Sequence, residues 1–355
     1  MPLTLEHPDA CIRIEELPPG RRLLSVRPRT DRATFPPASW QTAYSPALIE
    51  SILRAKGPAA LIDEICRDED PAYVQACLQA DLFCYVPPDR FARRRLLDFG
   101  CGAGASSLIL ARLLPHAAIT GIDLDDRFLD LARARAAHYG CRHLQFLRSP
   151  SPDCLPDGLG VFDFIVLSAV YEHLLPEERR RLLPALWSAL TPGGVLFLNQ
   201  TPWRWFPFEG HTSRLPLINY LPDRLALACA RLGSRRVRPD ETWTQLLRRG
   251  IRGGSVREVL RLLRTVGDPA PVLLQPAQPG MHDRIDVWYA GYAAAISHKY
   301  PWARSLQRLL RRLCKAVRCT TGMVLLPSLS LALQKPAAAC STPHGQAAPR
   351  PALPV

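Results

Sequence analysis

The middle of the chain alternates between short apolar runs and stretches of helical period. Between residues 93 and 201 the apolar runs are four to six residues long, which is the length of a buried strand. This alternation predicts an α/β core with a mainly parallel, doubly wound sheet. The predicted strands are Leu96–Phe99, Ala118–Ile122, Leu144–Leu147, Phe162–Leu167 and Val195–Leu198, and the predicted helices are Ala105–Leu114, Arg127–His138 and Glu177–Leu190.

The segments before this core follow weaker patterns. Residues 1–43 are rich in Pro, Arg and Glu and have no sustained period, so we expect a loosely ordered lead-in with one short strand near Leu23–Val26. Residues 44–92 predict an N-terminal helical cap, because Ser45 suits the N-cap position and Pro46 the first helical position.

The alternation stops after Asn199. Residues 202–320 are mostly of helical period and rich in Arg, which predicts a helical insertion forming the substrate region. Residues 321–335 return to a period of two and predict the last strand of the sheet. The Pro- and Ala-rich residues 336–355 predict a disordered tail.

The net charge of +13 is unevenly distributed. Residues 1–90 carry 10 basic and 13 acidic side chains, residues 91–200 carry 12 and 11, and residues 201–355 carry 23 and 8. The excess of positive charge therefore lies in the last third, while the α/β core is nearly neutral. Such a charge bears on the acceptor or on a surface contact rather than on the fold.

Eleven Cys residues are scattered along the chain without any C-x-x-C pair. Their odd number, together with the lack of a signal-like apolar stretch at the N-terminus, favours reduced thiols and a cytoplasmic location. The apolar runs are of strand length, so no transmembrane helix is expected. The sequence also predicts no metal site.

A glycine-rich turn follows the first strand of the core. Residues 97–106 (LDFGCGAGAS) place glycines at positions 100, 102 and 104, where a backbone without Cβ can turn sharply and lie against a ligand. The next strand ends at Asp123, 23 residues after Gly100. A carboxylate at that strand end can hold the two hydroxyls of a ribose, so this turn predicts a nucleotide-type cofactor site.

Four motifs, in order along the chain, resemble those of the class I S-adenosylmethionine-dependent methyltransferases, and in particular the bacterial domains of types 11 and 25. The family's acidic residue before G-x-G-x-G is matched at residues 98–104, and its F-D-x-[IV] strand at 162–165. Its Glu-His pair is matched at 172–173 and its L-x-P-G-G turn at 190–194. The resemblance implies a seven-stranded Rossmann-like sheet and S-adenosyl-L-methionine as the cofactor.

The resemblance also implies roles for residues of the glycine turn. Gly100, Gly102 and Gly104 are expected to cradle the methionine end of the cofactor, and the intervening Cys101 belongs to the same site. Asp98 is expected to anchor the loop or, through water, the amino group of the cofactor. The alternative for Asp98 is that it only braces the turn.

On the adenosine side, Asp123 is expected to take the ribose hydroxyls and Leu124 to flank the adenine. Many family members also have an Asp near the end of strand three that contacts the adenine amine. Here Ser149 or Pro150 stands at that position, and Asp153 is a candidate substitute.

Two other functions stay open on the sequence. Nicotinamide-dependent oxidoreductases have G-x-G-x-x-G in the same turn, and some accept Ala at the last position, which is Ala105 here. A cofactor-binding or membrane-associating module without turnover is the non-enzymatic alternative. Stabilisation by NAD or by S-adenosylmethionine would distinguish the two cofactors.

Base catalysis requires a group that titrates near neutrality beside the acceptor. His173 follows the fourth strand, whose carboxyl end faces the cofactor in this layout, and packing beside the cofactor is its alternative role. Glu209 and His211 lie two residues apart in the loop after strand five, within a P-x-E-x-H-T pattern that resembles a subset of bacterial methyltransferases. These three residues are the catalytic candidates, with bracing of the loop as the alternative for Glu209 and His211.

The expected acceptor is a small molecule, a glycan or a secondary metabolite methylated at oxygen. In the basic last third, residues 302–318 place Leu306, Leu309, Leu310, Leu313 and Val317 on one helical stripe, with the Arg and Lys side chains largely outside it. Such a helix either packs on the sheet or rests on an anionic membrane surface. The lack of a recognisable nucleic-acid module argues against a nucleic-acid partner.

Overall fold

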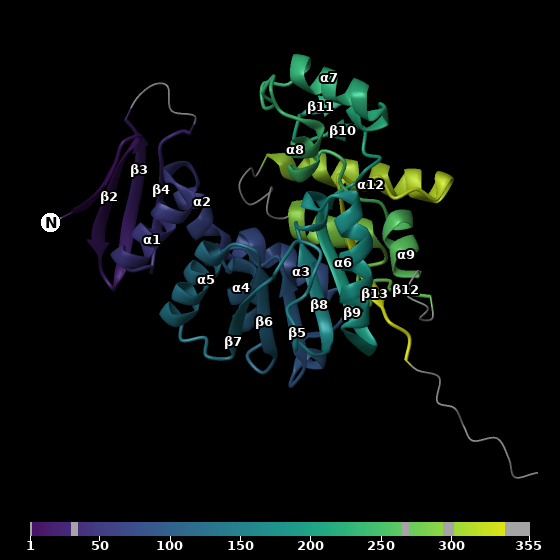
Figure 1. Cartoon of the computed structure of the whole chain (residues 1–355), viewed down its shortest axis with the longest axis horizontal. Helices are drawn as coiled ribbons and strands as arrows, with labels where there is room; N and C mark the ends of the chain where they lie inside the picture. The colour runs from purple at the N-terminus through teal and green to yellow at the C-terminus, as the bar shows by residue number, and fades with distance from the viewer. Residues whose placement is uncertain (1, 30–34, 265–269, 294–301, 338–355) are drawn as a thin grey trace, which may run out of the picture.

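The computed structural model describes residues 2–29, 35–264, 270–293 and 302–337. Its centre is a seven-stranded sheet with the order β12-β13-β9-β8-β5-β6-β7, in which only β12 and β13 pair antiparallel with their neighbours. The predicted mainly parallel, seven-stranded Rossmann-like sheet is confirmed (Figure 1). The strands are β5 (Arg95–Phe99), β6 (Ala118–Asp123), β7 (Leu144–Arg148), β8 (Phe162–Ser168), β9 (Leu190–Pro202), β12 (Val272–Leu273) and β13 (Ser328–Gln334).

Helices cover both faces of this sheet, as expected for doubly wound topology. Leu97 and Ile165 point to the side covered by α6 and α9, whereas Leu96 and Phe164 point to the side covered by α3 and α10. Strands buried on both faces need apolar residues at successive positions, which explains why β8 and β9 are nearly continuous apolar runs. The flanking helices are α3 (Ala76–Phe83), α4 (Ala105–Leu113), α5 (Asp126–His138), α6 (Pro176–Ser188), α9 (Val256–Arg264) and α10 (Arg284–Trp288).

The N-terminal region differs from the prediction of a loosely ordered lead-in at residues 1–43. It forms a four-stranded antiparallel sheet in the order β1-β2-β3-β4. Along β2 the side chains of Ile12 and Ile14 are buried while Arg13 and Glu15 are exposed, a period of two that the Pro- and Arg-rich composition concealed. The strands are β1 (Leu3–His7), β2 (Ala10–Leu17), β3 (Arg21–Pro28) and β4 (Ala38–Thr42).

The predicted helical cap follows this small sheet and packs on it. Its helices are α1 (Pro46–Lys56), α2 (Pro58–Glu69), the π-helix η1 (Pro71–Gln75), α3 and the 3-10 helix η2 (Pro88–Phe91). Ser45 accepts a hydrogen bond from the Leu48 backbone N–H, which confirms its N-cap role. Buried Ile49 and Ile52 of α1 join the small sheet in one apolar cluster.

A buried arginine ties this N-terminal region to the core. Arg135 of α5 is fully buried and donates to the Ala103 carbonyl oxygen at 3.0 Å and to the Glu64 carbonyl oxygen at 2.9 Å. Its guanidinium also lies 3.3 Å from the Glu64 carboxylate. Since Ala103 belongs to the glycine turn, α2 and α5 both support that turn.

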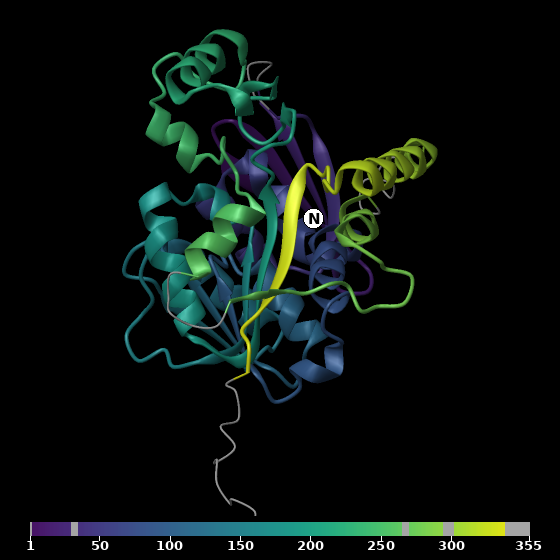
Figure 2. The ribbon, with the colours of Figure 1, turned by 90° about the vertical axis from the view of Figure 1, so that its right-hand side faces the viewer.

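The insertion is mostly helical, as predicted, but begins with a short hairpin. A lobe made of β10, β11, α7 and α8 extends beyond the carboxyl ends of the core strands (Figures 1 and 2). Its elements and those that follow are β10 (Phe208–Glu209), β11 (Leu215–Pro216), η4 (Ile218–Tyr220), α7 (Asp223–Gly233), α8 (Trp243–Arg248), the π-helix η5 (Tyr289–Ala293) and α12 (Ala303–Thr321).

The chain returns to the sheet at β13, which pairs antiparallel with β9 and confirms the predicted last strand, although the strand starts only at Ser328. The two-residue strand β12 was not predicted, because a pair of apolar residues carries no period. The predicted disordered tail at 336–355 lies outside the described residues from 338 onward. Within the described ranges, no helix combines the length and apolar character needed to cross a bilayer.

Candidate active site

The three glycines of the turn that follows β5 adopt a backbone conformation that L-residues rarely adopt. Gly100, Gly102 and Gly104 have φ values of 76°, 53° and 84°. A Cβ at Gly100 would lie 2.4 Å from Val170 Cγ2, and one at Gly104 would lie 2.6 Å from the Cβ of Ala132. At Gly102 the Cβ direction is open, so a side chain would fill space that the bare backbone leaves free for a ligand.

Asp98 is buried beneath this turn. Its Oδ2 accepts hydrogen bonds of 2.6 Å from the hydroxyls of Ser106 and Ser107, at the start of α4. Burial raises the pKa of the Asp98 carboxyl, and the two serine hydrogen bonds oppose that shift. These contacts favour the bracing alternative for Asp98. The Cys101 side chain is buried as well, and a Cβ added at Gly121 would lie 3.0 Å from its Sγ.

A cavity of about 210 Å³ opens at the carboxyl ends of β5 and β6. Of the predicted cofactor residues, Gly100, Asp123 and Leu124 line it. Its other lining residues include Phe99, Ile122, Ser149, Pro152, Ala169, Val170, His173, Leu174 and Arg248. The structure therefore brings the glycine turn, the ribose carboxylate candidate and one histidine to a single cavity.

The Asp123 carboxylate organises the mouth of this cavity. Its Oδ2 accepts the Gly102 N–H at 2.8 Å, and its Oδ1 accepts the N–H groups of Leu124 and Asp125 at 2.8 and 3.2 Å. A carboxylate has about four lone-pair sites, so capacity for a hydroxyl donor is left. Asp123 thus joins the glycine turn to the strand end that faces the ligand.

Sequence reasoning left the adenine side open and missed one residue entirely. Ser149 lines the cavity, whereas its hydroxyl donates to the carbonyl oxygens of Ser151 and Cys154. Asp153 is not among the lining residues; its carboxylate accepts from Ser151 and Arg181. Arg248 reaches the cavity from α8, and its distance along the chain gave no signal for this.

A second cavity, of about 480 Å³, lies beside the first. Ala169, with φ of 54°, lines both cavities. The second cavity has aromatic walls and several polar side chains. Its lining includes Glu172, Gln200, Trp203, Phe206, Phe208, Glu209, His211, Asn219, Arg252, Trp288, Tyr292 and Ser328.

The two histidine candidates meet where the cavities adjoin. Their ring centroids are 5.6 Å apart. His173, in η3 (Tyr171–His173), has its Nδ1 2.8 Å from the Arg248 carbonyl oxygen, so Nδ1 carries the proton and Nε2 is free to accept one. Burial lowers the pKa of His173. Burial and the neighbouring His173 lower the pKa of His211 as well, which keeps both rings neutral at pH 7.

Glu172 completes this group and was not singled out as a site residue from the sequence. Its side chain is buried and accepts a hydrogen bond from the Thr201 hydroxyl at 3.2 Å, while its Oε1 lies 3.8 Å from His173 Nε2. Burial raises the pKa of Glu172 to about 7. Glu172, His173 and His211 each offer one donor atom within 4.8 Å of the others, a set that could also hold a divalent cation.

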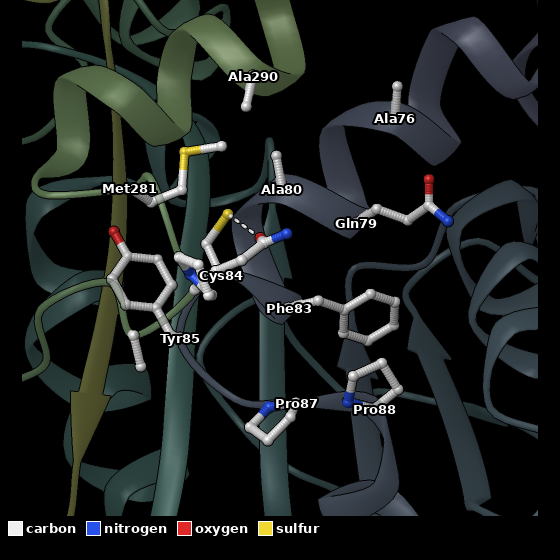
Figure 3. A pocket seen from close by; sticks show the side chains of 13 residues that line it. Ala76, Gln79, Ala80, Phe83, Cys84, Tyr85, Pro87, Pro88, Met281 and Ala290 are labelled. Atoms are coloured by element: carbon white, nitrogen blue, oxygen red, sulfur yellow. Dashed lines mark hydrogen bonds between the residues drawn. The ribbon is translucent and has the colours of Figure 1, made fainter.

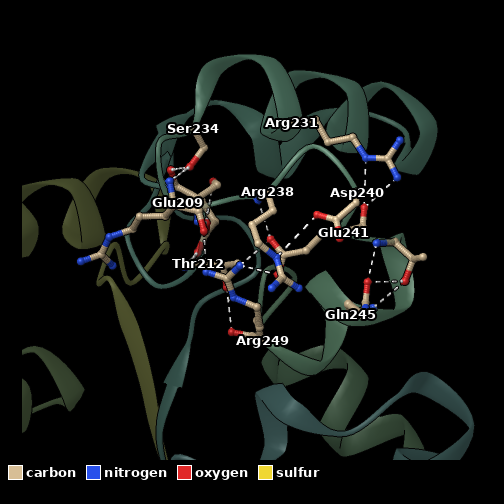
Figure 4. Close-up of polar contacts among 12 residues, drawn as sticks. Glu209, Thr212, Arg231, Ser234, Arg238, Asp240, Glu241, Gln245 and Arg249 are labelled. Atoms are coloured by element: carbon tan, nitrogen blue, oxygen red, sulfur yellow. Dashed lines mark hydrogen bonds and ion pairs between the residues drawn. The ribbon is translucent and has the colours of Figure 1, made fainter. Parts of the chain in front are cut away.

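The contacts of Glu209 distinguish between its two predicted roles. Its carboxylate accepts the backbone N–H groups of His211, Thr212 and Ser213 and the Ser213 hydroxyl, at 2.5 to 2.9 Å. The carboxylate is therefore saturated by its own loop, which favours the bracing alternative. Figure 4 shows that Thr212 is tied in turn to the Arg249 carbonyl oxygen, so the loop that presents His211 is fixed to the α7–α8 lobe.

A third cavity, of about 640 Å³, contains none of the predicted site residues (Figure 3). It lies between α3 and the segment around Met281, with Phe83, Tyr85 and Pro88 among its lining residues. No residue of the glycine turn and neither His173 nor His211 is among its lining residues, so this cavity is not part of the candidate active site.

Several observations test whether the first cavity fits S-adenosylmethionine. The backbone at Gly102 is open, Asp123 has acceptor capacity, and Leu124 is exposed at 42% beside it. The residues fit the cofactor.

Comparison with known proteins gives the same answer for this part of the chain. Residues 97–196 match a family model described as a methyltransferase domain. A trans-aconitate 2-methyltransferase of Methylobacterium radiotolerans is 34% identical over 117 residues, which are 33% of this chain and 41% of that protein. A ubiquinone biosynthesis O-methyltransferase of Caulobacter vibrioides is 36% identical over 110 residues, 30% of this chain and 41% of that protein.

Among solved structures, an amino pentose methyltransferase of Micromonospora echinaspora with bound S-adenosylmethionine is 29% identical, covering 41% of this chain and 56% of that chain with a TM-score of 0.32. The chain spans about two fifths of the length of the two curated relatives described. The matched segment begins within β5 and ends within β9, and it includes the glycine turn with Asp98 and Asp123. Residues 97–196 of this chain therefore form a class I S-adenosylmethionine-dependent methyltransferase domain.

Proposed function

We propose that this chain transfers a methyl group from S-adenosylmethionine to an oxygen of a small-molecule or glycan acceptor in the cytoplasm. The observation that carries the proposal is the junction of the two cavities. Ala169 lines both, and the consecutive residues Glu172 and His173 line one each. An acceptor in the second cavity therefore has a direct approach to a cofactor in the first cavity.

When bound, S-adenosylmethionine would supply an electrophilic methyl group for the acceptor oxygen, with S-adenosylhomocysteine as the leaving group. The protein then has to align the acceptor, exclude water and accept the hydroxyl proton. His211 lines the acceptor cavity, is neutral at pH 7 and is held by a braced loop. We assign it as the general base that takes the proton of the acceptor hydroxyl.

His173 supports this base by position. Its Nδ1–H is engaged by the Arg248 carbonyl oxygen, and its ring lies beside that of His211. A neutral neighbour with its free Nε2 toward the junction can accept a hydrogen bond there without adding charge. Glu209 acts through the loop and positions His211.

The lining of the second cavity supports a ring-shaped, polar acceptor. Trp288 and Tyr292 stack with centroids 5.9 Å apart at an interplanar angle of 11°. Gln200 and Asn219 add amide groups to the same lining. Aromatic faces with a few polar groups are typical of pockets that bind sugars or planar metabolites.

The test is release of S-adenosylhomocysteine with a panel of hydroxylated acceptors, sugars included, by the full chain and by His211→Gln. Turnover by the native chain and its loss in the variant are expected. A thermal-shift series with S-adenosylhomocysteine and NAD accompanies it, because only a bound ligand raises the melting temperature. Stabilisation by NAD alone would support an oxidoreductase, and cofactor binding without turnover across the panel would support a non-catalytic module.

A further inference from the structure

Helix α12 attaches to the protein through its charged side. The Arg311 guanidinium and the Lys315 ammonium each lie 2.6 Å from the Asp286 carboxylate, and Arg318 lies 2.5 Å from Asp283. Both aspartates are buried, at 1% and 3% exposure. Paired charges of this kind, with the acids removed from water, fix the rotation of α12 about its own axis.

This rotation leaves the leucine stripe facing outward. Leu306, Leu309, Leu310 and Leu313 follow the i, i+3, i+4, i+7 spacing of one helix face, and they are 42% to 54% exposed. The only buried residue of the helix is Ala303. An amphipathic helix on a globular protein normally turns its apolar stripe to the core, whereas α12 turns its apolar stripe to solvent. The helix also projects from the body of the protein (Figure 2).

Further basic side chains lie on the same helix. Arg312, three residues after Leu309, lies at the edge of the stripe, whereas Arg304 and Arg308 lie on the opposite side of the helix. Within the described ranges none of the three pairs with a carboxylate, and the helix itself contains no acidic residue. Trp302, at the start of the helix, is 75% exposed. An apolar stripe with an arginine at its edge and an aromatic end, on a helix without acidic residues, is complementary to an anionic lipid surface.

We propose that α12 lies in the plane of an anionic phospholipid bilayer, with its leucine stripe among the upper acyl chains and Arg312 at the level of the lipid phosphates. The helix is too charged to span a bilayer. A second copy of the chain is a poorer occupant, because face-to-face pairing would bring two basic helices together with no acidic residue on either helix to compensate.

The location of α12 connects this surface to the acceptor cavity. Asp286, which holds α12, belongs to α10, and Trp288 of the same helix lines that cavity. Docking would therefore hold the cavity at a fixed place relative to the membrane. The inference itself does not rest on the proposed methyl transfer, since it uses only α12 and its attachment.

The test is flotation of the full chain with vesicles of phosphatidylcholine and with vesicles that contain 30% phosphatidylglycerol. Binding to the second and much weaker binding to the first are expected. The triple variant Leu306→Gln/Leu309→Gln/Leu313→Gln should lose at least tenfold in partitioning onto the anionic vesicles, because it removes the inserted apolar surface. The control Leu232→Gln replaces a leucine that is 90% exposed on α7 and should bind like the native chain.

The variant Arg304→Gln/Arg308→Gln/Arg312→Gln tests the electrostatic part. It should lose at least about fivefold in affinity for anionic vesicles, which corresponds to about 1 kcal/mol for the one arginine that lies beside the surface. The control Arg90→Gln/Arg224→Gln/Arg235→Gln loses the same charge at exposed positions outside α12 and should retain binding. Absence of vesicle binding by the native chain, or a dimer that the leucine variant dissociates without any vesicle binding, would overturn the proposal.

Discussion

The imidazole Nδ1 of His173 lies 2.8 Å from the carbonyl oxygen of Arg248, a residue 75 positions later in the chain. The same arginine turns its guanidinium to Glu178 of α6, with contacts of 2.5 and 2.6 Å. The hydrogen bond fixes the tautomer of His173, and the ion pair fixes α8 over the cofactor cavity. The segment after β8, which carries His173, and the insertion, which carries Arg248, thus meet at one site.

Replacing the proposed base should separate catalysis from cofactor binding. His211→Gln removes the proton acceptor while keeping a side chain of similar polarity, so kcat should fall about 100-fold or more. The dissociation constant of S-adenosylhomocysteine, measured by calorimetry, should change less than about twofold, because His211 does not line the cofactor cavity.

His116→Gln is the matched control, since this histidine is exposed and remote from both cavities. It should leave both kcat and cofactor affinity unchanged. Native turnover in His211→Gln would remove His211 from the mechanism.

The pH dependence of the reaction should report the same group. Burial and His173 lower the pKa of His211 below 6.5, and the protonated ring cannot accept a proton. The value of kcat/KM should therefore rise with pH, pass its midpoint below pH 6.5 and level off above neutrality. This rise of kcat/KM with pH should be absent in His211→Gln. A midpoint above pH 7 in the native chain would contradict the assignment of His211 as the base.

The cofactor half of the site was predictable because its signals are local in sequence. Gly100 and Asp123 lie at adjacent strand ends, and parallel strands bring their carboxyl ends to one edge of the sheet. The acceptor half depends on distant segments. His173 could be named from its motif, but its partner Arg248 could not, because only the tertiary fold sets α8 against η3.

Two predictions were wrong or incomplete for different physical reasons. The four N-terminal strands were missed because strand pairing, rather than composition, buries Ile12 and Ile14. Glu209 was predicted either as catalytic or as a brace of its loop, and the hydrogen bonds that its carboxylate accepts from three successive backbone N–H groups favour the second role. A carboxylate two residues before a loop histidine is equally well placed to cap the loop, and the sequence pattern does not distinguish these roles.

Removing the ribose carboxylate should weaken cofactor binding. Asp123→Ala takes away the expected acceptor of the ribose hydroxyls and the acceptor of the Gly102 N–H, so the dissociation constant of S-adenosylhomocysteine should rise at least tenfold. Asp126→Ala removes an exposed carboxylate three residues away and should leave the constant unchanged. Equal affinities for native and Asp123→Ala would displace the ribose site from this strand end.

Asp81 should make the stability of the fold depend on pH. Burial raises the pKa of this carboxyl to about 7, with neighbouring Ser330 and Gln200 opposing the shift. The folded chain then binds more protons than the unfolded chain between about pH 4 and pH 7, so the contribution of Asp81 to the free energy of unfolding falls as the pH rises.

Asp81→Asn removes this ionisation. Relative to the native chain, its free energy of unfolding should increase from pH 4 to pH 8 by on the order of 4 kcal/mol, as measured by urea denaturation. Asp89→Asn changes an exposed carboxylate and should show no such trend. If the free energies of unfolding of Asp81→Asn and of the native chain differ by the same amount at every pH, the pKa of Asp81 is not raised by folding.

Chelation should leave methyl transfer intact. Glu172, His173 and His211 could jointly hold a divalent cation, but an imidazole that coordinates a metal cannot also accept the proton of the acceptor. The positive charges of Arg236 and Arg249 also act on His211 and oppose a bound cation. Turnover after dialysis against EDTA should therefore equal that before it, and added Mn²⁺ or Zn²⁺ should not raise it. Loss of turnover on chelation with recovery on adding metal would assign the three side chains as ligands instead of a base and its neighbours.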